Sequence, residues 1–247
     1  MSDLVISRLE GHVLHVELNR PQAKNALTTE MYESLVKIFG DARLNDEVRV
    51  LLFKGGRGCF CAGNDIQDFV TQPVLSEGTA VLAFLHELAN FDKPLIAAVA
   101  GPAPGVGTTF LLHCDLVYAT ASSIFSMPFV NLGVSPEAAS TYLLPRFLGH
   151  VRAAELLLLG ERITPEKALE LGLINAIVDE ADYWEYATAQ AEKIAAKPVE
   201  AVRATKRLLR AHNVSLHQVI DAEARQFVQL RDSEEAQAIF QGFLNKK

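Results

Sequence analysis

Apolar and polar residues alternate along two segments near the start of the chain, Val5 to Leu9 and Val13 to Leu18. Alternation with a period of two is typical of strands that are buried on one face. With a polar, glycine-containing connection between them, these segments predict a β-hairpin. The period then lengthens to that of a helix. A threonine cap at Thr28 or Thr29 predicts a helix from about Glu30 to Leu44.

Short apolar runs and amphipathic segments follow one another through the middle of the chain. The short runs predict strands, and segments with an apolar stripe at helical spacing predict helices. Strands are expected at Val48–Phe53, Leu95–Val99, Leu116–Ala119, Ile124–Met127 and Ile174–Val178. Helices are expected at Thr79–Asn90, Thr108–Cys114, Val151–Leu159 and Glu166–Leu171. Helices that alternate with buried strands in this way indicate an α/β fold.

The end of the chain has only helical patterns. Four amphipathic segments are expected to be helices, at Ala181–Ala196, Pro198–Ala211, Leu216–Leu230 and Ser233–Leu244. Each has one apolar face, and together they are too few to enclose an independent core. We therefore expect residues 1–180 to form the core and residues 181–247 to form a helical extension. No linker separates the two parts.

Composition places the chain among ordinary globular proteins. Apolar residues make up 49% and charged residues 21% of the 247 residues, enough for a large core. The formal net charge of −7 argues against nucleic acid or an anionic membrane surface as a partner. No apolar run has the length of a membrane-spanning helix and no targeting segment is recognisable, so a cytoplasmic location is expected. The three cysteines imply neither a disulfide framework nor a metal site.

Glycine and proline cluster between two apolar runs, in the sequence GPAPGVG (Gly101–Gly107). Such a cluster is unfavourable in a plain connector and indicates a place where the backbone approaches a ligand. If a helix begins at Thr108, the N–H groups of Val106 and Gly107 are unpaired donors at its start. Such donors can stabilise an anion that forms during a reaction. A tight turn within a buried core is the alternative.

A second turn of small residues, CFCAGNDI (Cys59–Ile66), follows the strand expected at Val48–Phe53. The backbone N–H of Asn64 can face the first turn, while Asp65 is expected to fix the turn rather than to take part in chemistry. Two N–H groups that point at one position from separate turns would form an oxyanion hole. The two turns together thus predict a site for acyl chemistry.

Three strings in this order resemble the enoyl-CoA hydratase/isomerase superfamily, which has the crotonase fold. They are NRPQAKNAL (Asn19–Leu27), CFCAGNDI and KPLIAAVAGPAPGVG (Lys93–Gly107). The resemblance covers nearly the whole chain. It implies a spiral of ββα units with a C-terminal helical trimerisation extension, and assembly as a homotrimer or dimer of trimers. It also implies an acyl-CoA thioester substrate, with coenzyme A as part of that substrate and no separate cofactor.

Glu137 ends the loop PFVNLGVSPE (Pro128–Glu137). By its position alone, a carboxylate there is more often a helix cap or a solvated residue than a base. The loop also resembles that of the peroxisomal-type Δ3,Δ2-enoyl-CoA isomerases, which implies that Glu137 is the catalytic glutamate. The two glutamates of enoyl-CoA hydratases are replaced by Thr109 and Phe129, neither of which can transfer a proton.

A single carboxylate suffices to move a double bond, whereas the addition of water needs a base and an acid. The resemblance therefore implies a Δ3,Δ2-enoyl-CoA isomerase in which Glu137 shuttles the proton and the N–H groups of Asn64 and Val106 form the oxyanion hole. Two alternatives stay open. One is a hydratase or thioester hydrolase on the same fold, and the other is an acyl-CoA-binding protein without activity.

The resemblance also implies a set of substrate-binding residues. Lys24, together with Lys54 or Arg57, is a candidate for the phosphates of coenzyme A, although each is equally well explained as a solvated loop charge. The remaining candidates line the adenine, pantetheine or acyl positions or their turns: Ala26, Ala62, Gly63, Asp65, Ile66, Gly105, Phe129 and Leu132.

Overall fold

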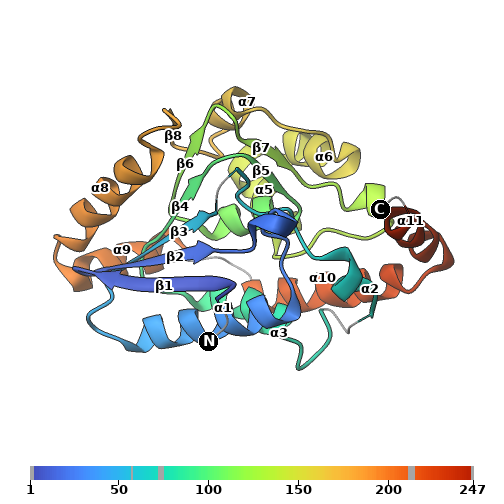
Figure 1. Cartoon of the computed structure of the whole chain (residues 1–247), viewed down its shortest axis with the longest axis horizontal. Helices are drawn as coiled ribbons and strands as arrows, with labels where there is room; N and C mark the ends of the chain where they lie inside the picture. The colour runs from blue at the N-terminus through green and yellow to red at the C-terminus, as the bar shows by residue number, and fades with distance from the viewer. Residues whose placement is uncertain (1–2, 57, 72–74, 211–214, 246–247) are drawn as a thin grey trace.

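The computed structural model describes residues 3–56, 58–71, 75–210 and 215–245. A six-stranded sheet in the order β1-β2-β3-β4-β6-β8 lies at its centre (Figure 1). The predicted hairpin is confirmed, since β1 and β2 pair in antiparallel register, while the other neighbours pair in parallel. The strands are β1 (Val5–Glu10), β2 (Val13–Leu18), β3 (Val50–Gly55), β4 (Leu95–Val99), β6 (Leu116–Thr120) and β8 (Ala176–Val178).

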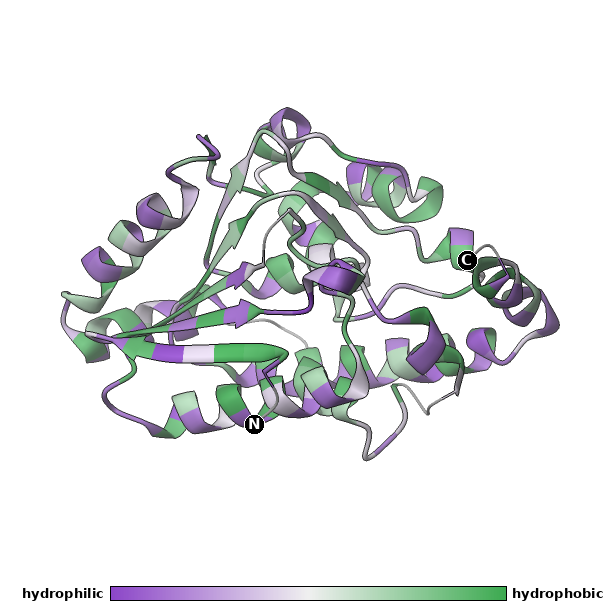
Figure 2. Ribbon diagram, viewed as in Figure 1, coloured by the Kyte–Doolittle hydropathy of each residue, from purple (hydrophilic) through white to green (hydrophobic). Residues whose placement is uncertain are grey.

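Helix α8 (Tyr183–Ala195) covers one face of the sheet. Successive residues of a strand point to opposite faces, and in β4 Ile96 and Ala98 pack against the alanines of α8. Those alanines, Ala187, Ala191 and Ala195, lie four residues apart on one helix face. Figure 2 shows the expected alternation of hydrophilic and hydrophobic segments along α8. The first helix of the expected extension thus completes the core of the sheet.

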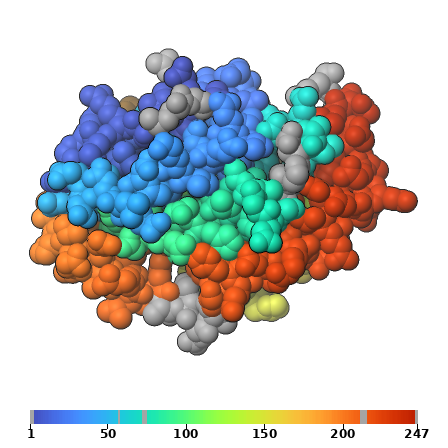
Figure 3. Space-filling view, turned by 90° about the horizontal axis from the view of Figure 1, so that it is seen from below, coloured from blue at the N-terminus to red at the C-terminus, as the bar shows by residue number. Residues whose placement is uncertain are grey.

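Helices α1 (Thr29–Leu44) and α3 (Ala80–Asn90) cover the opposite face. Leu95, Ala97 and Val99 of β4 belong to the same apolar cluster as the buried side chains of these helices. Helix α10 (Leu216–Arg231) packs against α3, and Figure 3 shows the surface on which α1, α3 and α10 lie side by side. The α/β class is therefore confirmed, with strands buried on both faces as parallel sheets require.

The other helices flank this layered core. Helix α11 (Glu234–Leu244) packs against α2 (Ile66–Thr71), a short helix that the sequence pattern did not predict. The rest are η1 (Pro21–Ala23), η3 (Val130–Leu132), α5 (Ser140–Leu148), α6 (His150–Leu159), α7 (Pro165–Glu170) and α9 (Val199–Leu209). In the part of the chain that the structure describes, no helix has both the length and the hydropathy needed to cross a membrane. The division at residue 180 stays a prediction.

The predicted helix over Thr108–Cys114 is wrong in its start and in its form. The structure has a single α-turn, α4 (Val106–Thr109), followed by a 3-10 helix, η2 (Phe110–His113). Gly105 begins the turn, because its carbonyl accepts hydrogen bonds from the N–H groups of Thr108 and Thr109. The residues before it form β5 (Pro102–Pro104), which pairs with β7 (Ile124–Ser126). The Thr108 hydroxyl contacts both strands, accepting from the Ser126 N–H and donating to the Ala103 carbonyl.

Candidate active site

The two turns of small residues meet because they follow neighbouring parallel strands. Strand β3 leads into the loop that contains Asn64, and β4 leads into the loop that contains Val106. Parallel neighbours end at the same edge of a sheet, where open α/β folds place their ligands. The loops also pair directly, since the Cys61 N–H donates to the Pro102 carbonyl over 3.2 Å.

Glycines permit this close approach of the two loops. A Cβ on Gly107 would lie 2.8 Å from the Cys61 carbonyl oxygen, and one on Gly101 would lie 2.5 Å from that of Gly58. Both contacts are too short for a side chain. Gly101 and Gly107 therefore allow the two loops to pack together, and the expectation that the cluster brings the backbone to a ligand stays a prediction. Only Gly105, with a φ of 59° and open space at its Cβ position, has room beside it.

Asn64 and Val106 both present unpaired backbone N–H groups. The residues on either side of Asn64 pair with Leu27: the Gly63 carbonyl accepts the Leu27 N–H, and the Asp65 N–H donates to the Leu27 carbonyl. The N–H of Asn64 therefore points away from Leu27. Val106 is the first residue of α4 and has no residue before it in the helix to accept its N–H. Within the described part of the chain, neither N–H has a hydrogen-bond partner.

A cavity of about 120 Å³ lies against these two residues. Its walls are apolar and contain no ionisable side chain among the described residues. Eight of the predicted site residues line it: Ala62, Gly63, Asn64, Ile66, Gly105, Val106, Phe129 and Leu132. Phe69, Phe227 and Phe240 line it as well, and the ring of Phe69 packs edge-on against the other two. The C-terminal helices α10 and α11 thereby contribute to the same cavity as the two turns.

Glu137 is buried, with 2% of its surface exposed, and it is not among the residues that line the cavity. Its Oε1 accepts a hydrogen bond from the Thr109 hydroxyl, while its Oε2 is buried with no partner in the described residues. Burial raises the pKa of Glu137 to about 8, because a charge is poorly solvated there. The hydrogen bond from Thr109 opposes this rise, and the nearby charge of Glu223 adds to it.

Tyr32 holds the side chain of Asn64, which lines the cavity. Its hydroxyl donates to Oδ1 of Asn64 over 2.6 Å, so the side chain of Asn64 is fixed to α1. Burial and then the charge of Glu137 raise the pKa of Tyr32 well above its usual value. The sequence analysis missed Tyr32. It could have been found in the sequence as a residue with a hydroxyl group within the apolar stripe of the helix, beside Met31 and Leu35.

Glu223 is the second residue that sequence reasoning missed. It lies on α10 with 8% of its surface exposed, although its neighbours along the helix stripe are the apolar Ile220, Ala224 and Phe227. Burial raises its pKa to about 7, against the effect of hydrogen bonds from Thr141 and Ala139. A carboxylate at helical spacing within an apolar stripe was the available signal, but its partners are far away in the sequence.

The structure places the other predicted residues outside the cavity. Lys24 is exposed, and its carbonyl accepts the N–H of Ala62, so it lies beside the lining. The carbonyl of Ala26 accepts from Arg20, which also forms an ion pair with Asp65 at 2.7 Å. Asp65 further accepts the Gln67 N–H at the start of α2, and its pKa is lowered by these bonds although burial opposes them. Asp65 therefore fixes the turn.

Of the other two candidate cations, Lys54 does not line the cavity. Lys54 lies 3.1 Å from Glu17 and over the ring of Trp184, on the side of the sheet that α8 covers. Lys54 is thus paired in this structure, and its part in binding phosphate stays a prediction. Arg57 lies outside the described residues.

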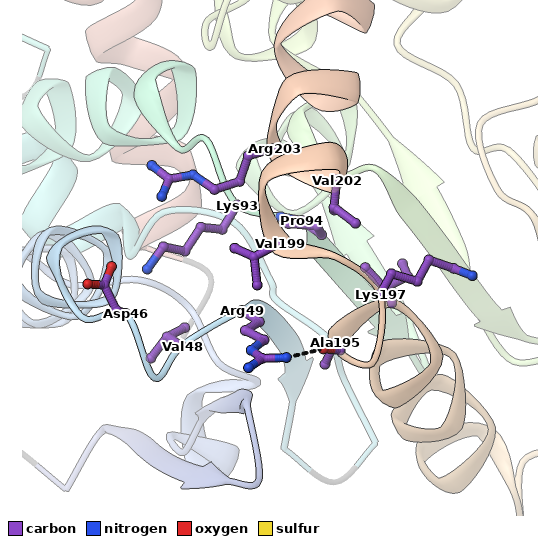
Figure 4. A pocket seen from close by; sticks show the side chains of 11 residues that line it. Asp46, Val48, Arg49, Lys93, Pro94, Ala195, Lys197, Val199, Val202 and Arg203 are labelled. Atoms are coloured by element: carbon purple, nitrogen blue, oxygen red, sulfur yellow. Dashed lines mark hydrogen bonds between the residues drawn. The ribbon is translucent and has the colours of Figure 1, made fainter.

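A second hollow lies beside the start of β3 and is too small to be a substrate site (Figure 4). Its volume of about 20 Å³ suits a single water molecule and no larger ligand. Three of the four cations that line it are also engaged. The Nζ of Lys93 donates to two backbone carbonyls, Arg49 donates to the Ala195 carbonyl, and Arg203 pairs with Asp92. The cavity beside Asn64 and Val106 is thus the better candidate for a substrate site.

The fold matches solved crotonase-fold structures along its whole length, and the chain is a crotonase-fold protein. It belongs to the enoyl-CoA hydratase/isomerase family, whose sequence pattern it matches over residues 8–247. Among solved structures, OdaA of Pseudomonas aeruginosa superposes with a TM-score of 0.94 at 42% identity, covering 98% of this chain and 99% of that one.

Curated relatives include both isomerases and hydratases. Enoyl-CoA delta isomerase 2 of Rattus norvegicus is 32% identical over 96% of this chain, but this chain spans only 62% of its length. The 2,3-dehydroadipyl-CoA hydratase of Escherichia coli is 33% identical over 100% of this chain and 97% of its own length. Family membership therefore leaves open which reaction this chain catalyses.

Proposed function

We propose that this protein is a Δ3,Δ2-enoyl-CoA isomerase that uses Glu137 as its one acid–base group. The observation that carries the proposal is a difference in hydrogen bonding between the two buried carboxylates near the site, Glu137 and Glu223. Both oxygens of Glu223 accept hydrogen bonds from α5, whereas Oε2 of Glu137 has no partner in the described residues. Of these two carboxylates, only Glu137 has an oxygen without a hydrogen-bond partner in the described residues. We propose that this oxygen, which is buried and outside the cavity lining, takes the proton from a bound substrate.

The cavity supplies the groups that such a base requires. A thioester carbonyl placed against Asn64 and Val106 would accept hydrogen bonds from their free N–H groups. Glu137 would then remove a proton from C2 of a 3-enoyl-CoA, and the charge of the resulting dienolate would rest mainly on the thioester oxygen. Return of the proton to C4 completes the isomerisation. Coenzyme A is part of the substrate, and no separate cofactor enters this scheme.

The hydroxyl of Thr109 favours isomerisation over hydration. Hydration needs a second carboxylate to activate water, and the position that holds one in hydratases is occupied here by Thr109. In this structure the hydroxyl of Thr109 donates a hydrogen bond to Oε1 of Glu137. It therefore orients the base and stabilises its ionised form rather than acting as a second base.

The products of two substrates test the proposal. With 3-hexenoyl-CoA the protein should form the 2-enoyl product, while with a 2-enoyl-CoA it should form little or no 3-hydroxyacyl-CoA. Chromatography of both reactions would show the result. Rapid hydration would support the hydratase alternative, and free acid with coenzyme A would support a hydrolase. If neither reaction occurs and C2 of a saturated acyl-CoA exchanges no proton with solvent, the protein binds without catalysis.

The pH dependence of the rate should follow the ionisation of Glu137. The base must be ionised, and burial raises its pKa to about 8, so kcat should rise with pH, reach half its maximum near pH 8 and level off above it. Thr109→Val removes the hydrogen bond that favours the ionised form and should move this rise to higher pH. A rate that is flat from pH 6 to 9 in both proteins would contradict Glu137 as the titrating base.

Assembly and location are also proposals. We infer a homotrimer or dimer of trimers, supported by apolar surface on α6, where Val151, Leu158 and Leu159 are 80%, 69% and 54% exposed. A second copy of the chain would remove these side chains from water. A cytoplasmic location likewise stays a proposal, since a relative from Mus musculus is named a peroxisomal isomerase.

A further inference from the structure

A buried carboxylate on α10 is attached to the backbone that follows Glu137. Oε2 of Glu223 accepts the N–H of Ala139 over 2.6 Å, and its Oε1 accepts the N–H of Thr141 over 3.0 Å. The Thr141 hydroxyl donates to Oε1 as well. Ala139 is the cap residue of α5 and has no side chain that could satisfy the first N–H groups of the helix. Glu223 therefore caps α5 from another helix.

The two residues after Glu137 have an unusual backbone. Ala138 and Ala139 have φ values of 59° and 57°, in the left-handed region that residues with a Cβ rarely adopt. Such a conformation persists only where surrounding contacts hold it. Here Glu223 binds the N–H of Ala139, and Nε2 of His113 lies 2.8 Å from the Ala138 carbonyl oxygen. The turn directs the chain away immediately after Glu137 and so fixes where that side chain leaves the backbone.

We propose that Glu223 is a positioning residue for Glu137: by holding Ala138 and Ala139 in the left-handed conformation, it keeps the base beside Thr109 with Oε2 free. The inference rests on the proposed role of Glu137. It assigns to α10, within the expected helical extension, a function in organising the site.

Electrostatics adds a signature to this geometry. The Thr109 hydroxyl, on α4, contacts Glu137 directly. The charge of Glu137 also adds to the rise that burial causes in the pKa of Tyr32, on α1, and of Cys61, in the loop after β3. Glu223 adds its negative charge, which raises the pKa of Glu137. Replacing Glu223 by a neutral residue removes that repulsion, so the pKa of Glu137 should fall.

The test compares Glu223→Gln and Glu223→Ala with Asp221→Asn as the matched control. Asp221 is a carboxylate on the same helix, but it contacts His86 on α3, 2.9 Å away. For each variant, kcat and KM for 3-hexenoyl-CoA are measured across pH. The ionisation of Glu137 is followed independently by infrared difference spectroscopy, with Glu137→Gln identifying its carboxyl band.

Glu223→Ala should lower kcat by about 10- to 100-fold, as expected for a displaced catalytic group, while KM changes by less than about threefold. In both Glu223 variants the pH at which the carboxyl band of Glu137 titrates should fall, and the rise in kcat should occur at correspondingly lower pH. Glu223→Gln keeps one acceptor oxygen and should lose less kcat. Asp221→Asn should change neither quantity.

Unchanged kcat and an unmoved Glu137 band would overturn the proposal, even if thermal stability falls. If Glu223→Ala does not fold, Glu223→Gln decides the question in the same way. The infrared titration needs no turnover. A wild-type protein that does not isomerise would therefore refute the proposed function, and the infrared titration of the Glu223 variants would still show whether Glu223 acts on Glu137.

Discussion

Replacing Glu137 by glutamine should reduce the isomerisation rate by about 10³-fold or more, the effect expected when an acid–base group is removed. Glutamine keeps the size of the side chain and an oxygen that can accept the Thr109 hydrogen bond, so the fold should survive. It cannot take a proton from C2. Initial rates with 3-hexenoyl-CoA, together with the affinity for a saturated acyl-CoA, would separate lost chemistry from lost binding.

Glu170→Gln is the matched control for this change. Glu170 is an exposed glutamate that pairs with Lys167 within α7, and its loss should leave the rate unchanged. Binding of the saturated acyl-CoA should be retained in both variants. A Glu137→Gln protein that keeps more than about a tenth of the wild-type rate would mean that another group is the base.

Replacing Val106 by proline should lower the rate by about 10²- to 10³-fold, the usual effect of removing one oxyanion-hole donor. Proline has no N–H, so this change deletes the proposed donor itself. The position suits the test, because Val106 is the first residue of α4 and proline is well tolerated at the first position of a helix. The rate is measured together with acyl-CoA binding and thermal unfolding.

Val106→Ala is the control for the loss of the valine side chain. It keeps the N–H and removes only apolar atoms from a side chain that is 2% exposed, so its rate should stay within a few-fold of wild type. Equal losses in both variants would show that the side chain, and not the N–H, is needed. The oxyanion hole would then have to be formed by other donors.

Local patterns predicted most of the secondary structure because their causes are local. The alternation in β1 and β2 and the threonine caps follow from neighbours in the sequence. Thr28, Thr79 and Thr164 each accept the N–H of the third residue after them, as helix caps do. The apolar stripes likewise marked the buried faces of α1, α3 and α10.

The segment around α4 was predicted incorrectly because its conformation depends on distant partners. Its apolar run has the composition of a helix, but the hydroxyl of Thr108 bonds to both strands of a small sheet. One of those strands, β7, lies beyond the next strand of the main sheet. Pairing of this kind leaves no periodic signal in the run itself.

The composition of the two turns, with Asn64 and Val106, was visible in the sequence, and so was the place of Glu137 in a family-like loop. These depend on residue type and order, which a chain carries without folding. Only the tertiary structure showed that parallel pairing of β3 with β4 brings the turns to one edge. It alone showed that Glu137 accepts the Thr109 hydroxyl, and that Glu223, 84 positions beyond Ala139, holds the turn after Glu137. Burial and hydrogen-bond geometry arise from contacts between segments remote in the sequence, so no local pattern encodes them.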